Sequence, residues 1–100
     1  MIRGTTPTHV FELPFSTDLL KQFLITYAQE GEIVLEKAKD DCELLEETIR
    51  VTLTQEDTLK FSHENCVEIQ LKVLTINGQL LATPICFAQI GRILNSEVLV

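Results

Sequence analysis

Apolar and polar residues alternate along the longest segments of this chain, and this pattern limits the folds that it can adopt. From Thr48 to Thr54, and again from Cys66 to Val73, every second residue is apolar. Side chains two residues apart share one face of a strand, whereas a helix needs apolar positions three and four residues apart. Both segments therefore predict half-buried strands. Their inward positions would be Ile49, Val51, Leu53, Val67, Ile69, Leu71 and Val73.

Two further segments predict a hairpin. Residues 22–29 and 32–38 alternate in the same way, and Glu30-Gly31 between them is short enough to form a tight turn. The inward side chains of this hairpin would be Phe23, Ile25, Tyr27, Ile33 and Leu35.

The strongest turn signal is Asn77-Gly78. Asn and Gly best tolerate the positive φ that both central residues of a type I′ turn require. Alternation in the preceding strand breaks at Leu74, which indicates a bulge, a twist or coverage on both faces there. The returning strand would run from Leu80 to Ile90 and be interrupted at Pro84. Proline has no backbone N–H to donate to a neighbouring strand, so this strand is expected at a sheet edge or bent at that point.

The remaining segments are shorter. A first strand stops near Pro14, and residues 42–45 predict a short strand between two acidic turns. Thr54, with an acidic residue three positions later, predicts a capped helical turn near residues 55–59. The tail from Gly91 to Val100 has no clear period. Side chains expected to point inward in these segments are His9, Phe11, Leu13, Phe15, Leu59 and Phe61.

Together these segments predict one all-β domain spanning residues 1–100. We expect an antiparallel β-sandwich of immunoglobulin-like shape, with about seven strands and one short helical turn near residues 55–59. Alternating strands fit this arrangement better than a parallel sheet, whose strands are apolar on both faces. The chain has no Trp, so the Cys–Trp–Cys signature of antibody domains is absent. A small barrel is the alternative.

The charge of the chain excludes two classes of partner. Lys and Arg number 8 and Asp and Glu number 15, so the net charge is −7. Binding to a nucleic-acid backbone or to an anionic membrane needs clustered cations. The one close basic grouping is Lys37 with Lys39. We therefore expect neither nucleic acid nor membrane as a partner.

Cysteine content and targeting signals indicate a reducing compartment. Residues 1–9 have no apolar segment typical of a secretory signal, and no stretch approaches the roughly 18 apolar residues of a membrane span. Cys42, Cys66 and Cys86 are odd in number and lie in apolar or alternating runs. We expect free thiols and a cytoplasmic product.

No motif specifies a catalytic, metal or cofactor site. His63 and Cys66 lie three residues apart at a loop–strand junction, which is the spacing of a possible Cys–His dyad, and His9 is the other candidate base. No glycine-rich loop or helix N-terminus that could form an oxyanion hole accompanies them. Zinc would need four ligands, and Cys42 and Cys86 are distant in sequence. We expect no catalytic residue, no metal ligand and no cofactor.

Two groups of carboxylates have other possible roles. Glu32 and Glu36 are expected on one strand face with Val34 between them, but a glycosidase pair needs an aromatic-lined cleft, and the chain has one Tyr and no Trp. The other group lacks the D-x-[DN]-x-[DN]-G pattern of a calcium loop and is typical of a solvated turn. Its members are Asp40, Asp41, Glu43, Glu46 and Glu47.

Sheet edges and the chain ends are the remaining candidates for function. A sandwich leaves unpaired backbone groups on its edge strands. The segment near the start of the chain, Gly4 to Thr8, is polar, whereas the segment at its end, Val98 to Val100, is apolar. Apolar segments are stabilised by burial, either on their own core or on a neighbouring copy, and the sequence leaves both open.

The chain contains MIRGTTPTH at residues 1–9, VTLTQEDTLKF at residues 51–61, and VEIQLKVLT at residues 67–75 followed by Asn77-Gly78. Taken together, these stretches resemble small proteins encoded by tailed phages and prophages of gut Firmicutes. The likeness extends to a closing Gly91-Arg92 and Glu97-Val98-Leu99, and so covers nearly the whole chain. Asn65 and Cys66 depart from it, since simple polar turn residues are expected there.

A looser likeness concerns architecture. The layout of a strand, LTQEDT and a further strand is similar to the N-terminal β-sandwich modules of phage baseplate upper proteins. The resemblance implies a role in the virion or its assembly and transfers no catalytic residue. It also implies synthesis in the bacterial cytoplasm, with the virion as a possible destination.

The sequence therefore predicts a non-enzymatic phage structural or assembly protein. It would act through protein–protein contacts made by self-association, sheet edges and terminal arms, as a homo-oligomer or with other phage structural proteins. The alternative is a β-sandwich module that binds a host protein or a glycan. That function needs a concave patch with exposed aromatic or convergent polar groups, and the shortage of aromatics counts against it.

Overall fold

The computed structural model describes all 100 residues and contains eight strands, one short α-helix and two 3₁₀ turns. The strands are β1 Thr8–Glu12, β2 Leu20–Gln29, β3 Glu32–Ala38, β4 Glu43–Leu45, β5 Thr48–Thr52, β6 Val67–Thr75, β7 Leu80–Ala82 and β8 Cys86–Ala88. Helix α1 covers Gln55–Leu59, and the 3₁₀ turns η1 and η2 cover Thr17–Leu19 and Lys39–Asp41. None of these helical segments has the length and apolar character of a membrane-spanning helix.

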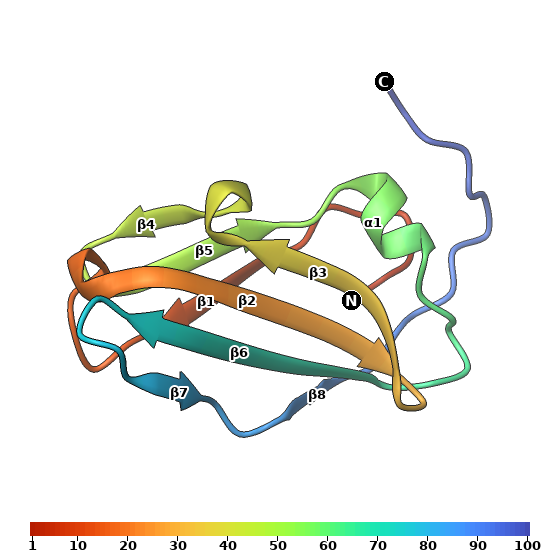
Figure 1. Cartoon of the computed structure of the whole chain (residues 1–100). Helices are drawn as coiled ribbons and strands as arrows, with labels where there is room; N and C mark the ends of the chain where they lie inside the picture. The colour runs from red at the N-terminus through yellow and green to blue at the C-terminus, as the bar shows by residue number, and fades with distance from the viewer.

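The strands form two antiparallel sheets that pack face to face (Figure 1). One sheet has the order β1-β5-β4, and the other has the order β3-β2-β6-β7, with β8 also pairing with β6. This is the arrangement of the immunoglobulin sandwich, in which strands B-E-D face strands C′-C-F-G. Here β7 and β8 together take the place of strand G. The predicted all-β, antiparallel, immunoglobulin-like sandwich is therefore confirmed.

The core lies between the two sheets and uses the inward positions that the alternation predicts. The long central strands β2 and β6 form the middle of the larger sheet, and β5 forms the middle of the smaller one. Removing each large apolar side chain from water contributes roughly 1.5–3 kcal/mol. The buried hydrophobic residues are Leu20, Phe23, Ile25, Tyr27, Leu35, Ile49, Val51, Leu53, Phe61, Val67, Ile69, Leu71, Val73 and Ile90.

The predicted helical turn is confirmed, and so is its cap. The Thr54 hydroxyl accepts from the Asp57 backbone N–H at 3.0 Å, and the Asp57 carboxylate accepts from the Thr54 N–H at 3.0 Å. This reciprocal pair satisfies two backbone donors at the start of α1. The helix ends at Leu59, which is half-buried, and Phe61 then enters the core.

The type I′ turn lies in a different hairpin from the one predicted. Glu30 and Gly31 have φ of 50° and 78° and join β2 to β3 in a two-residue loop. In the hairpin between β6 and β7, Gly78 has a φ of 88° but Asn77 does not have a positive φ. Gly78 N–H donates to the Thr75 carbonyl at 3.0 Å. That hairpin therefore has a three-residue loop ending in a left-handed glycine.

Strand β3 contains a β-bulge that the sequence pattern did not predict. Tyr27 is opposite Leu35 and Ala28 is opposite Ile33, so Val34 is the extra residue of a β-bulge. A bulge breaks the alternation, so the residues before it and those after it no longer follow one inward–outward pattern. As a result Ile33 is 61% exposed, and Val34 packs against the core instead. The prediction that Ile33 points inward is wrong.

The irregularity predicted at Leu74 lies in the neighbouring strand. Strand β6 keeps its alternation through to Thr75, which is buried, while the register of β2 shifts between Leu20 and Gln22. The interruption predicted at Pro84 is confirmed, because β7 ends before it and β8 begins after it.

Candidate functional site

A hydrogen bond joins the two sheets inside the sandwich. The His9 Nδ1 atom on β1 lies 2.7 Å from the Tyr27 hydroxyl on β2. Burial raises the pKa of Tyr27, and the nearby Cys42 and Asp57 raise it further. Burial also lowers the pKa of His9, with a smaller effect from the N-terminal ammonium group. Both partners are therefore neutral at pH 7, and the hydrogen bond between them is a structural link between the sheets.

An ion pair holds α1 against the larger sheet. Lys37 Nζ on β3 lies 2.9 Å from Asp57 Oδ2, and the two side chains are only 16% and 10% exposed. Burial opposes ionisation of Asp57. The hydrogen bonds from the Thr54 backbone and from Lys37 outweigh it, so the pKa of Asp57 is lowered. This carboxylate is used twice, as the cap that accepts from the Thr54 N–H and as the counter-ion of Lys37.

Gln29 is a buried polar residue that the sequence reading missed. Its Nε2 donates to the carbonyls of Ser62 and Asn65 at 2.8 and 3.0 Å, and its Oε1 accepts from the Ser62 N–H at 2.9 Å. Its burial was indicated by its place in the alternating pattern, since it shares the inward face of β2 with Tyr27. Gln29 fixes the loop between α1 and β6, where the candidate dyad lies.

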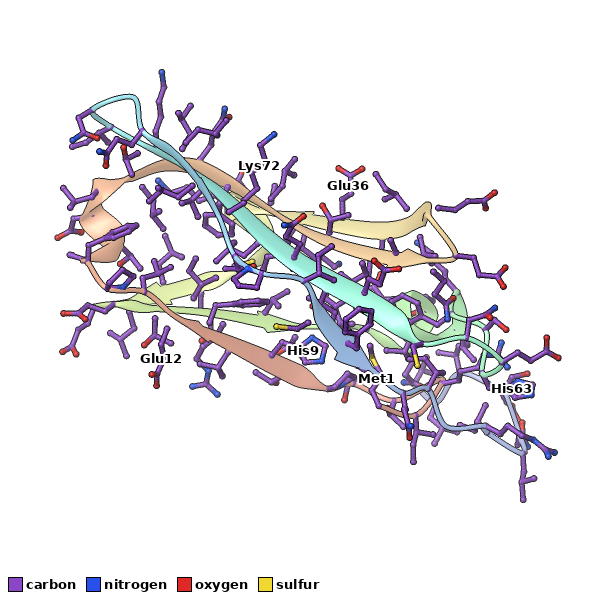
Figure 2. The ribbon with its side chains drawn as sticks, turned by 90° about the horizontal axis from the view of Figure 1, so that it is seen from below. Met1, His9, Glu12, Glu36, His63 and Lys72 are labelled. Atoms are coloured by element: carbon purple, nitrogen blue, oxygen red, sulfur yellow. The ribbon has the colours of Figure 1, made fainter.

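His63 and Cys66 are both exposed in that loop, and Figure 2 shows His63 at one end of the molecule. Cys42 is half-buried, and burial raises its pKa to about 11, with Asp41 raising it and Lys37 lowering it. All three cysteines are free. No three His, Cys, Asp or Glu side chains lie close enough together to hold a metal ion.

The structure also separates the carboxylates. Glu32 is opposite Gln29 and Glu36 is opposite Thr26, so the bulge at Val34 places the two glutamates on opposite faces of the sheet. The expectation that they share a face is wrong. Among the acidic residues of segment 40–47, Asp41 accepts from the Ala38 backbone N–H at 2.9 Å and closes the η2 turn.

A hollow of about 560 Å³ opens at one end of the larger sheet. Lys21, Lys39 and Lys72 line it, together with apolar side chains that include Leu24 and Leu80. Lys72 projects from the same side of the molecule as Glu36 (Figure 2). The hollow brings three of the eight cationic side chains of an acidic protein together.

Ile90 follows β8 and is buried in the core, and the tail beyond it runs beside α1 (Figure 1). A Cβ built on Gly4 would lie 3.1 Å from the Ile93 side chain, so Ile93 packs over the start of the chain. Further on, the Gln55 side chain donates to the Leu99 carbonyl at 2.7 Å and accepts from the Leu99 N–H at 2.9 Å. Leu94 and Leu99 remain exposed. Of the two alternatives that the sequence left open, burial of the far tail in its own core is not what the structure shows.

Comparison with models of known families gives no match, and neither does comparison with curated proteins. Among solved structures, the V domain of amphioxus IgVJ-C2 aligns over 91% of this chain and 95% of that chain, with 14% sequence identity and a TM-score of 0.37. The immunoglobulin-like arrangement follows from the strand order and pairing of this chain itself.

Proposed function

We propose that this protein is a non-catalytic structural or assembly component of a phage particle, acting through protein–protein contacts. The observation that carries the proposal is the set of large apolar side chains left outside the core along the last strands and the tail. Water around such side chains is released when a partner covers them. The side chains are Leu80, Leu81, Ile85, Phe87, Leu94 and Leu99.

The polar residues support a non-catalytic role. His9 and Tyr27 satisfy each other across the sheets, and Asp57 is held by Lys37 and its own helix cap. These groups are engaged in holding the sandwich together. Catalysis by general acids and bases needs groups free to exchange protons with a substrate near neutral pH.

The test is whether the protein becomes part of particles. Particles from a strain that carries the gene are purified on a density gradient, and the protein is quantified in each fraction by mass spectrometry. We expect it in the particle or precursor-particle fractions at a fixed copy number. Presence in the free-protein fraction alone, at every stage of assembly, would contradict the proposal.

The lysine-lined hollow favours a second candidate, a module that binds an acidic glycan or an acidic protein segment. Titration with a sulfated oligosaccharide and with its unsulfated form tests it. Binding of the sulfated form alone, weakened by Lys21→Gln and Lys72→Gln but not by the exposed-site control Lys60→Gln, would support this candidate. Equal binding by all variants, or none, would remove it.

A further inference from the structure

Each sheet has two edges, and the four edges differ in charge. Three carry acidic residues: Glu12 on β1, Glu32 and Glu36 on β3, and Glu43 on β4. Charged side chains on an edge strand discourage it from pairing with another chain. Two copies of a protein with a net charge of −7 would repel one another most strongly where acidic edges meet.

The fourth edge, formed by β7 and β8, carries no charge. Between Lys72 and Arg92 no residue is charged, and this uncharged segment contains both strands. At this edge two copies could approach closely with the least electrostatic cost.

The backbone of β7 has unpaired groups at this edge. Thr75 N–H donates to the Gln79 carbonyl and Thr83 N–H donates to the Leu71 carbonyl, so residues 79 and 83 direct their backbone groups toward β6. Backbone groups alternate in direction along a strand. Leu80 and Ala82, at the intervening positions, therefore direct their N–H and C=O groups outward, where another strand can reach them.

Apolar side chains flank that backbone on both sides. Leu80 is opposite Leu74 and Phe87 is opposite Glu68, which places both on the outer face, and they are 61% and 70% exposed. Leu81 lies on the inner side and lines a cavity of about 210 Å³ between the β1 end of one sheet and the β7 edge of the other. An added strand would thus find apolar contacts above and below it.

We infer that two copies of this chain associate through their β7–β8 edges. The inference rests on the proposed function and names one partner for it. A two-fold axis would bring identical uncharged edges together, so that the same residues contact one another in both directions. The two edges would run antiparallel about an axis near Pro84, so that β7 of each copy lies beside β8 of the other and the outward groups of Leu80 and Ala82 gain partners. Leu80 of one copy would then lie close to Phe87 of the other.

Pro84 limits the strength of this contact. It divides the edge into two stretches of three residues, so few backbone hydrogen bonds can form. Apolar side chains then supply most of the contact. The resulting dimer should be weak and concentration-dependent.

The experiment is sedimentation velocity on the full chain and on two matched variants, over roughly 10 µM to 1 mM, where weak interfaces associate. Phe87→Lys places a charge on the proposed interface. Ile33→Lys makes the same kind of change at a similarly exposed position on the acidic β3 edge. Both side chains point into water, so both variants should fold, and circular dichroism checks this.

We expect the wild type and Ile33→Lys to pass from monomer to dimer as concentration rises, while Phe87→Lys remains monomeric. Amide exchange at Leu80 and Ala82 should slow at least about tenfold in the dimer. A wild type that is monomeric throughout overturns the inference, and so does a dimer lost in Ile33→Lys but kept in Phe87→Lys. If either result occurs while the protein still co-purifies with particles, the inference fails and the proposed function stands.

Discussion

Lys37 Nζ and Asp57 Oδ2 lie 2.9 Å apart in a largely buried position, and they join strand β3 to helix α1. The same carboxylate caps α1 through the Thr54 N–H. A single side chain therefore fixes both the start of the helix and its attachment to the larger sheet. Loss of its charge should loosen the connection between β5 and β6.

Asp57→Asn should lower the free energy of unfolding by about 3 kcal/mol, because it leaves the Lys37 ammonium group buried without a counter-ion. The pKa of Asp57 is lowered from 3.8, so the unfolded chain takes up the proton first as pH falls. The stabilisation of the folded protein by ionised Asp57 is fully present above pH 3.8, and it is lost as pH falls through the pKa of Asp57 in the folded protein. Urea denaturation at several pH values measures both effects. The exposed neighbour Glu56 provides the control Glu56→Gln, and equal losses in the two variants would contradict the prediction.

His9 should make stability depend on pH near neutrality. Its pKa is lowered from 6.5 in the folded protein, chiefly by burial, so the unfolded chain binds the extra proton more readily. The stabilisation that comes from keeping His9 neutral is fully present above pH 6.5, and it is lost as pH falls through the pKa of His9 in the folded protein. Denaturation midpoints across this range should fall for the wild type and stay flatter for His9→Gln. His63→Gln, at the exposed loop, should keep the wild-type slope; a slope that disappears in this control instead would refute the assignment.

The turn between β2 and β3 offers a stabilising substitution. Glu30 has a φ of 50°, which costs less for Asn than for Glu. We expect Glu30→Asn to raise the free energy of unfolding by roughly 0.5–1 kcal/mol. Gly31→Ala should lower it by about 1 kcal/mol, although a Cβ there meets no neighbour, because φ at this position is 78°. Thermal denaturation measures both, with Glu32→Asn as the control outside the turn. A gain in that control as large as the gain at position 30 would argue against the turn as the cause.

Cys42 should be the slower of two thiols toward alkylation. Burial, with Asp41 nearby, raises its pKa to about 11, so little thiolate is present at pH 8. Cys66 is exposed. Peptide mass spectrometry after timed exposure to iodoacetamide should show Cys66 modified well before Cys42, and the difference should vanish in denaturant. Equal rates in the folded protein would mean that Cys42 is less protected than the structure indicates.

Much of the fold was predictable from local alternation. Phe23, Ile25 and Tyr27 had to share a face once they were in a strand, and burial of that face fixed the direction of their neighbours. The capped turn before Asp57 was predictable for the same reason, since its hydrogen bonds join residues three apart. These features depend only on geometry within one segment.

The bulge at Val34 and the turn types depended on neighbouring strands. Whether Ile33 faces the core is decided by its register against Ala28, which local alternation does not encode. Asn77 is compatible with a type I′ turn, but the pairing of Thr75 with Gln79 leaves three residues in the loop and assigns the positive φ to Gly78 alone. Turn type follows from how many residues the paired strands leave between them.

Side-chain period and turn chemistry act between near neighbours, so they indicate which segments become strands and, where no bulge intervenes, which faces those strands bury. The hydrogen bond between His9 and Tyr27, the ion pair between Lys37 and Asp57, and the uncharged edge formed by β7 and β8 depend instead on how the strands are arranged in space. Those relationships join residues distant in the chain. They exist only once strand order has placed the segments side by side.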